Sequence, residues 1–402
     1  MTVTHAPGRS RDDRASAAGL RRSDTVAGVL HATLEHLHRL VRFDAAYISG
    51  TDPETTLYSR AVITEGVPGS SCAPIVHNEF HEHDVNKVAA LHRAGPRGHV
   101  TTLHRATGGR PDRSPRARTV NRELGLGPEL RATFSTARHC WGAMTLLRAE
   151  GDGDFTDAEL SLVAGSSRLV TTRLREVTLR ELARPAGPDQ PCGVVTLDEQ
   201  GRVVAMTDRA AELVDGLSML PVADILLPAA VPRGAPGELH VVASLAQAQA
   251  QAQARAGRPG DGVVDLPEAV VRIPSPTHGW LTLRAECARD AGGTVVATHV
   301  VLEQSRPADV LAMVVACYDL SPREEEVLVE VVAGRGTDEI AARLVISPHT
   351  VRDHVKALFE KTGTRSRGEL ASHLFAVHYK PTLQLDHRPP RSAASGVSAV
   401  GR

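Results

Sequence analysis

The first part of the chain mixes helical and strand-like hydrophobic patterns. Residues 24–42 place apolar side chains three or four positions apart, which predicts an amphipathic helix, and FDAAYIS at 43–49 then has the composition of a strand. Two further strand-like runs bracket a turn within residues 130–147. A capping box at 156–159, Thr followed by Glu three residues later, opens a long amphipathic helix. This order of elements predicts an α+β domain.

A second α+β domain is predicted after the segment RPAGPDQP at 184–191, which cannot continue a helix. The sequence CGVVTLDEQGRVVAM predicts two strands around a turn, and a short helix follows. Further strands are predicted at 270–273, 279–286 and 294–303. The repetitive run AQAQAQAQA that begins at Ala246 either extends a helix or is an insertion, and it suggests no function.

The C-terminal part has a helical pattern with clear start signals. Ser321 and Pro322, with Glu324 completing a capping box, predict the start of a first helix, and the pair Ser347 and Pro348 predicts the start of the third. Thr337 is the predicted cap of the second helix, and Ser366 with Glu369 opens a fourth. The short turn at 345–346 between the second and third helices predicts a helix-turn-helix unit.

The third of these helices has two chemically distinct faces. Val351, Val355 and Leu358 recur at i, i+4 and i+7, so they point inward. One polar face gathers the side chains at 349, 352, 353, 356 and 360. A polar face on an isolated helix is usually solvated charge, but behind a helix and a tight turn it predicts a recognition helix.

The predicted fold class is therefore multidomain, with two α+β domains followed by an all-α four-helix domain. The predicted segments are a disordered arm at 1–22, the first domain with its C-terminal linking helix at 23–183, the second domain at 188–304, the helical domain at 316–380 and a disordered tail at 381–402. Residues 96–115, rich in Gly, Pro and Arg, are predicted to form a loop or insertion.

Composition narrows the class of protein. The net charge is −1, yet residues 319–342 hold two basic and seven acidic side chains whereas 343–367 hold six basic and two acidic ones. One half of the helical domain is thus suited to face phosphate. The five cysteines are widely spaced without a C-x-x-C pair, which argues against a disulfide framework. With no apolar run long enough for a membrane span and no signal peptide, we expect a cytoplasmic protein.

The segment LSPREEEVLVEVVAGRGTDEIAARLVISPHTVRDHVKALFEKTGTRSRGEL resembles the LuxR/FixJ-type helix-turn-helix family along its whole length. The resemblance implies a DNA-binding domain whose third helix enters the major groove and whose fourth helix forms a homodimer. It implies three residues that face base edges: Arg352, Asp353 and Lys356. It implies five residues at or near phosphates: Thr337, Thr350, His354, Lys361 and Arg367. It implies three residues of the dimer helix: Leu370, Leu374 and Phe375.

Two acidic positions qualify this comparison. Asp338 stands where the family often has Lys or Asn, and it removes one phosphate contact. Asp353 either accepts a hydrogen bond from cytosine N4, and so acts as a specificity filter, or pairs with Arg352.

Residues 24–183 resemble a GAF domain through FDAAYIS, WGAMTLLR and the helix opened by FTDAEL. The segment GVVTLDEQGRVVAMTDRAAELV, with WLTLRAECA and VVATHVVLEQ, resembles a PAS domain. This domain order is similar to a group of actinobacterial regulators. It implies a sequence-specific transcription regulator in which sensory domains, with a small-molecule ligand or a protein partner, control a dimer bound to double-stranded DNA.

Other classes find less support in the sequence. A receiver domain would need an alternating β/α pattern with an acidic pair, and an ATP-driven regulator would need a P-loop; neither pattern is present, nor is G-x-S-x-G. We therefore expect no enzyme and no cofactor. One alternative is a redox, metal or haem sensor built on Cys72 and the nearby His77, His81 and His83, and against it these histidines read as solvated loop residues. Another is a regulator whose front half binds a protein partner.

Overall fold

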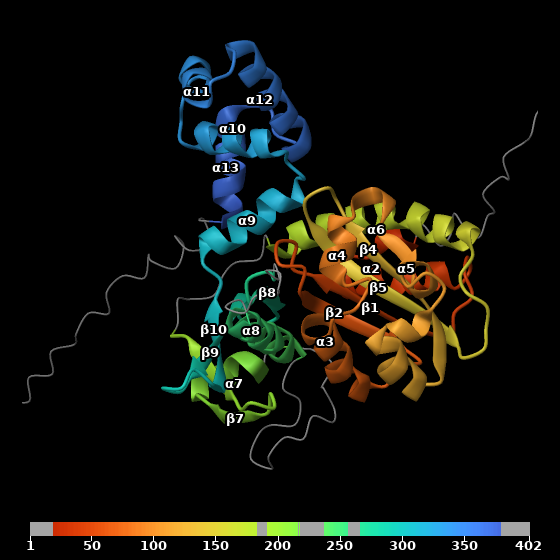
Figure 1. The fold of residues 1–402 in the computed structure, drawn as a ribbon. Coiled ribbons are helices and arrows are strands. Elements are labelled where there is room, and N and C mark those ends of the chain that lie inside the picture. Colours follow the sequence, from red (N-terminus) through yellow and green to blue (C-terminus); the bar gives the residue numbers. More distant parts are fainter. Residues whose placement is uncertain (1–18, 183–190, 216, 218–236, 256–265, 379–402) are drawn as a thin grey trace, which may run out of the picture.

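The computed structural model describes residues 19–182, 191–215, 217, 237–255 and 266–378. The predicted disordered tail lies outside these residues, as do the first 18 residues of the predicted disordered arm. Two five-stranded antiparallel sheets and a cluster of helices make up the fold (Figure 1). No helix within the described ranges is long and apolar enough to cross a membrane.

The first sheet has the strand order β2-β1-β5-β4-β3. Its strands are β1 (Ala45–Thr51), β2 (Tyr58–Glu65), β3 (Val100–Thr102), β4 (Leu126–Ser135) and β5 (Cys140–Ala149). Alternation along the strands gives the sheet two unlike faces. On one face Ile48, Leu130, Phe134 and Leu146 pack against helices α2 (Val26–Leu37) and α6 (Asp157–Leu182). Because these side chains are fully buried, that face holds the main core of the domain.

The opposite face of the first sheet is covered by short helices that the sequence pattern did not predict. They are α3 (Cys72–His81), α4 (Val88–Arg93), α5 (Leu103–Ala106) and the π-helical turn η4 (Ala117–Asn121). The prediction of a loop at 96–115 is wrong in part, because β3 pairs with β4 and the hydroxyl of Thr102 caps α5 by accepting from the Arg105 amide. These short helices contain too few apolar residues to show a helical period in the sequence.

The second sheet has the order β7-β6-β10-β9-β8. Its strands are β6 (Gly193–Leu197), β7 (Val203–Met206), β8 (Val270–Ser275), β9 (Gly279–Arg289) and β10 (Val295–Gln304), with helices α7 (Asp208–Asp215) and α8 (Gly237–Arg255). The repetitive alanine–glutamine run forms the C-terminal half of α8. Its alanines at 246, 248 and 250 are buried, and Gln247 donates to Thr298 of β10 at 3.2 Å. The run is therefore a packed helix.

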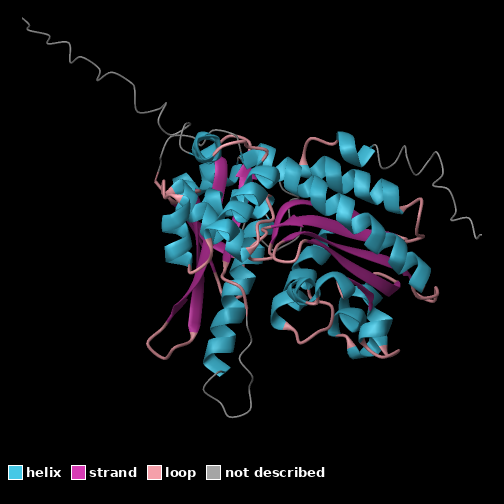
Figure 2. Ribbon diagram, turned by 90° about the horizontal axis from the view of Figure 1, so that it is seen from above, coloured by secondary structure: helices cyan, strands magenta, loops and turns pink. Residues whose placement is uncertain are grey.

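The two sheet domains share a buried contact. Edge strands β2 and β8 lie side by side, and Figure 2 shows the strands of the two sheets as separate groups. The carboxylate of Asp52, which has no exposed surface, accepts from the Arg272 backbone amide at 3.0 Å and from its guanidinium at 3.1 Å. The edge strand β8 of the second sheet is thus covered by the first domain.

The helical domain follows a connecting helix, α9 (Pro307–Cys317), which the sequence pattern also missed. Among the described residues four more helices follow: α10 (Pro322–Val332), α11 (Thr337–Leu344), α12 (Pro348–Thr362) and α13 (Arg367–His378). The predicted starts of the first and third are confirmed, and the capping box of Ser321 and Glu324 forms in both directions. The prediction of Thr337 as the cap of the second helix is wrong, because Gly336 is the N-cap and Thr337 is the first helical residue.

Candidate DNA-binding interface

The turn between α11 and α12 sets the direction of the third helix. Val345 ends α11 in the left-handed conformation, with φ 55° and ψ 52°. Its neighbour Ile346 donates to the Ala341 carbonyl at 3.0 Å, and the Ser347 hydroxyl caps α12 by accepting from the Thr350 amide at 3.0 Å. These bonds satisfy backbone groups that the two helix ends would otherwise leave free. The result is a tight helix-turn-helix.

Strain in that turn leads to a prediction. A β-branched residue rarely adopts the left-handed region of backbone conformation. Val345 is 87% exposed, so burial of its side chain does not offset the backbone strain. Replacing Val345 with Asn should stabilise the helical domain by about 1 kcal/mol, because Asn tolerates this conformation. Amide hydrogen exchange in α11 and α12 should slow about fivefold, whereas Val345→Leu should not slow it. Equal exchange in Val345→Asn and the parent would contradict the strain argument.

The inward face of α12 is as predicted. Val351, Val355 and Leu358 are buried, with Leu358 and Val351 fully enclosed. They share a core cluster with Val327 and Ile340 of the two preceding helices. Because three apolar positions fix the rotation of α12 about its axis, the opposite face must point outward.

That outward face presents the residues predicted to read bases. Arg352, Asp353 and Lys356 are all exposed. Within the part of the chain that the structure describes, Arg352 has no hydrogen-bond or ion-pair partner. Asp353 pairs with His349 at 3.0 Å, so its carboxylate is engaged one turn away and not by Arg352. The Lys356 ammonium lies 3.9 Å from Glu360, a distance at which an exposed pair contributes little. Arg352 and Lys356 can therefore donate outward.

Two of the predicted phosphate contacts are engaged inside the domain. The Lys361 ammonium donates to the Glu324 carboxylate at 2.7 Å and to the Asp319 carbonyl at 2.9 Å. Burial favours a raised pKa for Glu324, but hydrogen bonds from Lys361 and from Ser321 outweigh it and hold the pKa below its usual value. A phosphate would have to compete with this carboxylate for Lys361.

Arg367 has comparable ties. Its guanidinium donates to the Thr337 hydroxyl at 2.9 Å and to the Arg335 carbonyl at 2.8 Å, which joins the start of α13 to the start of α11. The structure thus brings Arg367 and Thr337 together. The remaining two predicted contacts, Thr350 and His354, lie half-buried along α12, and the Thr350 hydroxyl lies 2.9 Å from that of Ser347.

Helix α13, which was predicted to form the dimer contact, packs its apolar residues within the chain. Leu370 is fully buried and Leu374 is 5% exposed, both in the core cluster that includes α9 and α10. The side chain of Phe375 lies outside the described residues. A charge at Leu374 would therefore disrupt the fold of the domain, so the test of dimerisation must use other residues.

The cysteine and histidine cluster of the first domain does not form a metal site. His77 and His81 lie on helix α3 together with Cys72, so the expectation of loop histidines is wrong for these two, whereas His83 lies in the loop that follows. The two nitrogens of the His81 ring face Ser244 at 3.0 Å and Gln251 at 3.4 Å, both on α8. Within the described ranges, no three His, Cys, Asp or Glu side chains are placed to hold a metal ion. His81 instead helps to join the two sheet domains.

One feature that the sequence reasoning missed is a buried charge network on the second face of the first sheet. Arg116 donates to both oxygens of Glu129, at 2.9 and 2.7 Å, and Arg131 donates to Glu79 at 3.2 Å. These side chains are at most 7% exposed. Their spacing carries no sequence signal, since Glu79 and Arg131 lie 52 positions apart and join different elements.

Comparison with known proteins identifies the helical domain. Residues 319–374 match the family described as bacterial regulatory proteins, luxR family. The uncharacterized transcriptional regulatory protein YhcZ of Bacillus subtilis is 45% identical over 62 residues, which are 15% of this chain and 28% of that protein. The probable transcriptional regulatory protein NarL of Mycobacterium tuberculosis is 46% identical over 48 residues, which are 12% of this chain and 22% of NarL. The chain thus spans less than a third of these relatives.

Similarity to solved structures is low. Escherichia coli SdiA shows 12% identity and a TM-score of 0.31, over 91% of this chain and 96% of SdiA. A GAF domain/HD domain protein from Geobacter sulfurreducens shows 18% identity and a TM-score of 0.29, over 40% of this chain and 98% of that chain. Similarity at this level does not define the fold of the sheet domains.

The chain therefore carries a DNA-binding domain of the helix-turn-helix class at its C-terminal end. That domain is of the LuxR type, as the resemblance of its sequence implied.

Proposed function

We propose that this chain is a cytoplasmic, sequence-specific transcription regulator that binds double-stranded DNA as a homodimer through α12. The observation that carries the proposal is that α12 buries one face in the core of its domain and exposes the other. On the exposed face, Arg352 and Lys356 are directed outward. Both side chains can donate to guanine O6 and N7 in the major groove. The relatives of the helical domain are described as transcriptional regulatory proteins, which agrees with this use.

We propose further that the two sheet domains are GAF-like and PAS-like sensory domains that control the DNA-binding domain. The first has a sheet flanked by the long helix α6, and the second has a five-stranded sheet with α7 and α8. Their contact through Asp52 and Arg272 makes the pair a single body to which the DNA-binding domain is attached. A signal in either sheet domain could thus reach that attachment.

Selection of DNA from a random double-stranded pool tests the central proposal. The full chain should enrich a palindromic sequence and bind it about 10³-fold or more tightly than scrambled DNA at the same salt concentration. Palindromy is expected because a two-fold dimer reads two half-sites. Enrichment of no sequence, or equal affinity for selected and scrambled DNA, would refute sequence-specific binding.

A further inference from the structure

The exposed face of α12 carries polar side chains in two rows. Arg352 and Lys356, four positions apart, form one row, and the other consists of His349 and Asp353, also four positions apart. Neighbours in sequence do not face each other on a helix, so Arg352 is not placed to hold the carboxylate of Asp353. The first row can only donate hydrogen bonds, whereas the carboxylate of the second row can only accept them. The two rows therefore differ in the base edges that they can contact.

His349 holds the carboxylate of Asp353 at one place on this face. The Nδ1 atom of His349 lies 3.0 Å from Oδ2 of Asp353. Among the described residues, neither side chain has another hydrogen-bond or ion-pair partner. Because a carboxylate only accepts, the ring nitrogen that faces it must carry the hydrogen. The contact leaves Oδ1 of Asp353 available to accept from a base.

Stability of the fold does not account for this pair. The side chains of His349 and Asp353 are 81% and 64% exposed, and an ion pair with such exposure contributes little to folding. In the major groove the same contact has a larger effect, because a carboxylate that is not held must lose its rotational freedom when it binds a base. A partner that already fixes the carboxylate in the free protein reduces that cost.

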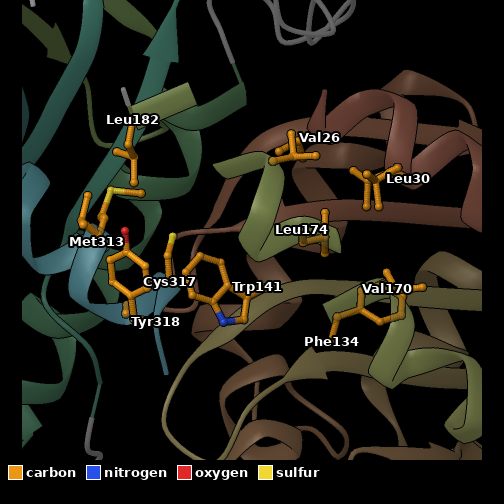
Figure 3. Packing of buried hydrophobic residues seen from close by; sticks show 14 of the residues in the cluster. Val26, Leu30, Phe134, Trp141, Val170, Leu174, Leu182, Met313, Cys317 and Tyr318 are labelled. Atoms are coloured by element: carbon orange, nitrogen blue, oxygen red, sulfur yellow. The ribbon is translucent and has the colours of Figure 1, made fainter. Parts of the chain in front are cut away.

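The sheet domains leave this face of α12 open. They meet the DNA-binding domain through α9, whose Met313 lies in the apolar cluster with Trp141 of the first sheet (Figure 3). They also meet it through the ion pair of Arg138 with Glu325 on α10. The main contacts of α12 itself are with α10 and α11. Both rows of polar side chains are therefore exposed in the chain as a whole.

We propose that His349 is a positioning residue for sequence readout: it holds the Asp353 carboxylate so that this side chain accepts a hydrogen bond from cytosine N4 in the major groove. This inference rests on the proposed binding of DNA through α12. Guanine and thymine present oxygen acceptors in the groove, which a carboxylate repels, and adenine has an acceptor nitrogen beside its amino group. Cytosine presents the amino donor alone. Since Arg352 and Lys356 can donate to guanine, the two rows together suit G·C pairs.

Replacing the base pairs of the selected DNA one at a time, with the full chain, locates the contact. The parent should lose affinity about five- to 150-fold when the cytosine read by Asp353 is replaced, or when an analogue without the 4-amino group takes its place. In Asp353→Ala this penalty should disappear. In His349→Ala it should fall about three- to tenfold, while the penalties at other positions stay unchanged. His349→Gln keeps an N–H donor one turn from Asp353 and should retain the penalty to within about twofold.

A double variant separates positioning from a direct contact with DNA. In the Asp353→Ala background, His349→Ala should not change the penalty at this cytosine further, because the ring acts through the carboxylate. His77→Ala, which removes the exposed His77–Glu82 pair on α3, is the matched control and should leave every penalty unchanged. Since His349 and Asp353 are exposed, their variants should unfold at the urea concentration of the parent. If His349→Ala does not fold, His349→Ser takes its place.

The outcomes separate this inference from the proposed function. If the chain selects DNA but no cytosine is sensitive to Asp353→Ala, or if His349→Ala leaves the penalty at that cytosine intact, positioning by His349 is refuted while sequence-specific binding stands. A further loss on adding His349→Ala to Asp353→Ala would also refute it, since the ring would then contact DNA itself. Selection of no sequence would refute both proposals.

Discussion

Replacing Arg352 or Lys356 with alanine should lower affinity for the selected DNA about five- to 150-fold while leaving affinity for scrambled DNA nearly unchanged. The range corresponds to about 1–3 kcal/mol for the loss of one base contact. Both residues lie one turn apart on the exposed face of α12, near its N-terminal half, where recognition helices meet base edges. Because neither contributes to the core, the variants should fold like the parent.

Replacing Lys361 should change the affinity for DNA in a different way. A lost phosphate contact weakens binding to every sequence and lowers the salt slope by about one, so Lys361→Ala should reduce both affinities together. It should also loosen the turn at Asp319 before α10, since Lys361 donates to Glu324 and to the Asp319 carbonyl. Titrations of selected and scrambled DNA at several salt concentrations distinguish the two patterns. An unchanged specificity ratio in Arg352→Ala and Lys356→Ala would mean that a different face of α12 enters the groove.

The helical domain could be predicted from sequence because its signals are local. Ser321 with Glu324, and Ser347 before a proline, fix helix starts through bonds that span only three residues, and these bonds are present in the structure. The inward positions of α12 follow from period alone. The same reasoning predicted most strands of both sheets and missed β2 and β3.

Helix α9 could not be predicted in this way. Its sequence is apolar on every side, so no period distinguishes a buried face, and its partners α6 and α13 come from two different domains. The burial of Leu370 and Leu374 within the chain could not be predicted for the same reason. An apolar stripe shows that a helix face will be covered, but whether by its own chain or by a second copy depends on contacts distant in sequence.

The buried charges of the first domain were missed because the partners that compensate for their desolvation lie far away in the sequence. Arg116 directly follows the Gly, Pro and Arg-rich stretch at 96–115 that was predicted to be a loop, yet it is 1% exposed and lies against Glu129 of β4. A charge with no nearby partner in sequence is ordinarily read as solvated. Only the pairing of β4 with its neighbours brings this carboxylate under η4.

This network should carry the largest effect on stability. We expect Arg116→Met to destabilise the first domain by about 3–5 kcal/mol at pH 7, because it leaves the carboxylate of Glu129 buried without its main partner. Arg116 also donates to Asn78 at 2.8 Å, so a second buried acceptor loses its bond. The exposed Arg118 in the same segment provides the control, and Arg118→Met should change stability by less than about 0.5 kcal/mol.

The pKa of Glu129 determines how the destabilisation by Arg116→Met should change with pH. Burial alone favours a raised pKa for Glu129, but the charge and hydrogen bonds of Arg116 outweigh it, so the net pKa of this carboxyl lies below its usual value. A carboxylate with a lowered pKa stabilises the fold above the pKa of the unfolded chain, and that contribution is lost as pH falls through the folded pKa. In Arg116→Met burial dominates, which raises the pKa and allows protonation to relieve the cost. The gap between parent and variant, measured by urea unfolding monitored through amide exchange in β4 and β5, should therefore narrow as the pH falls from neutral through the raised pKa of Glu129 in the variant, and narrow further through its lowered pKa in the parent. A gap that stays constant over this range would show that the loss comes from packing around Arg116 and not from the uncompensated charge of Glu129.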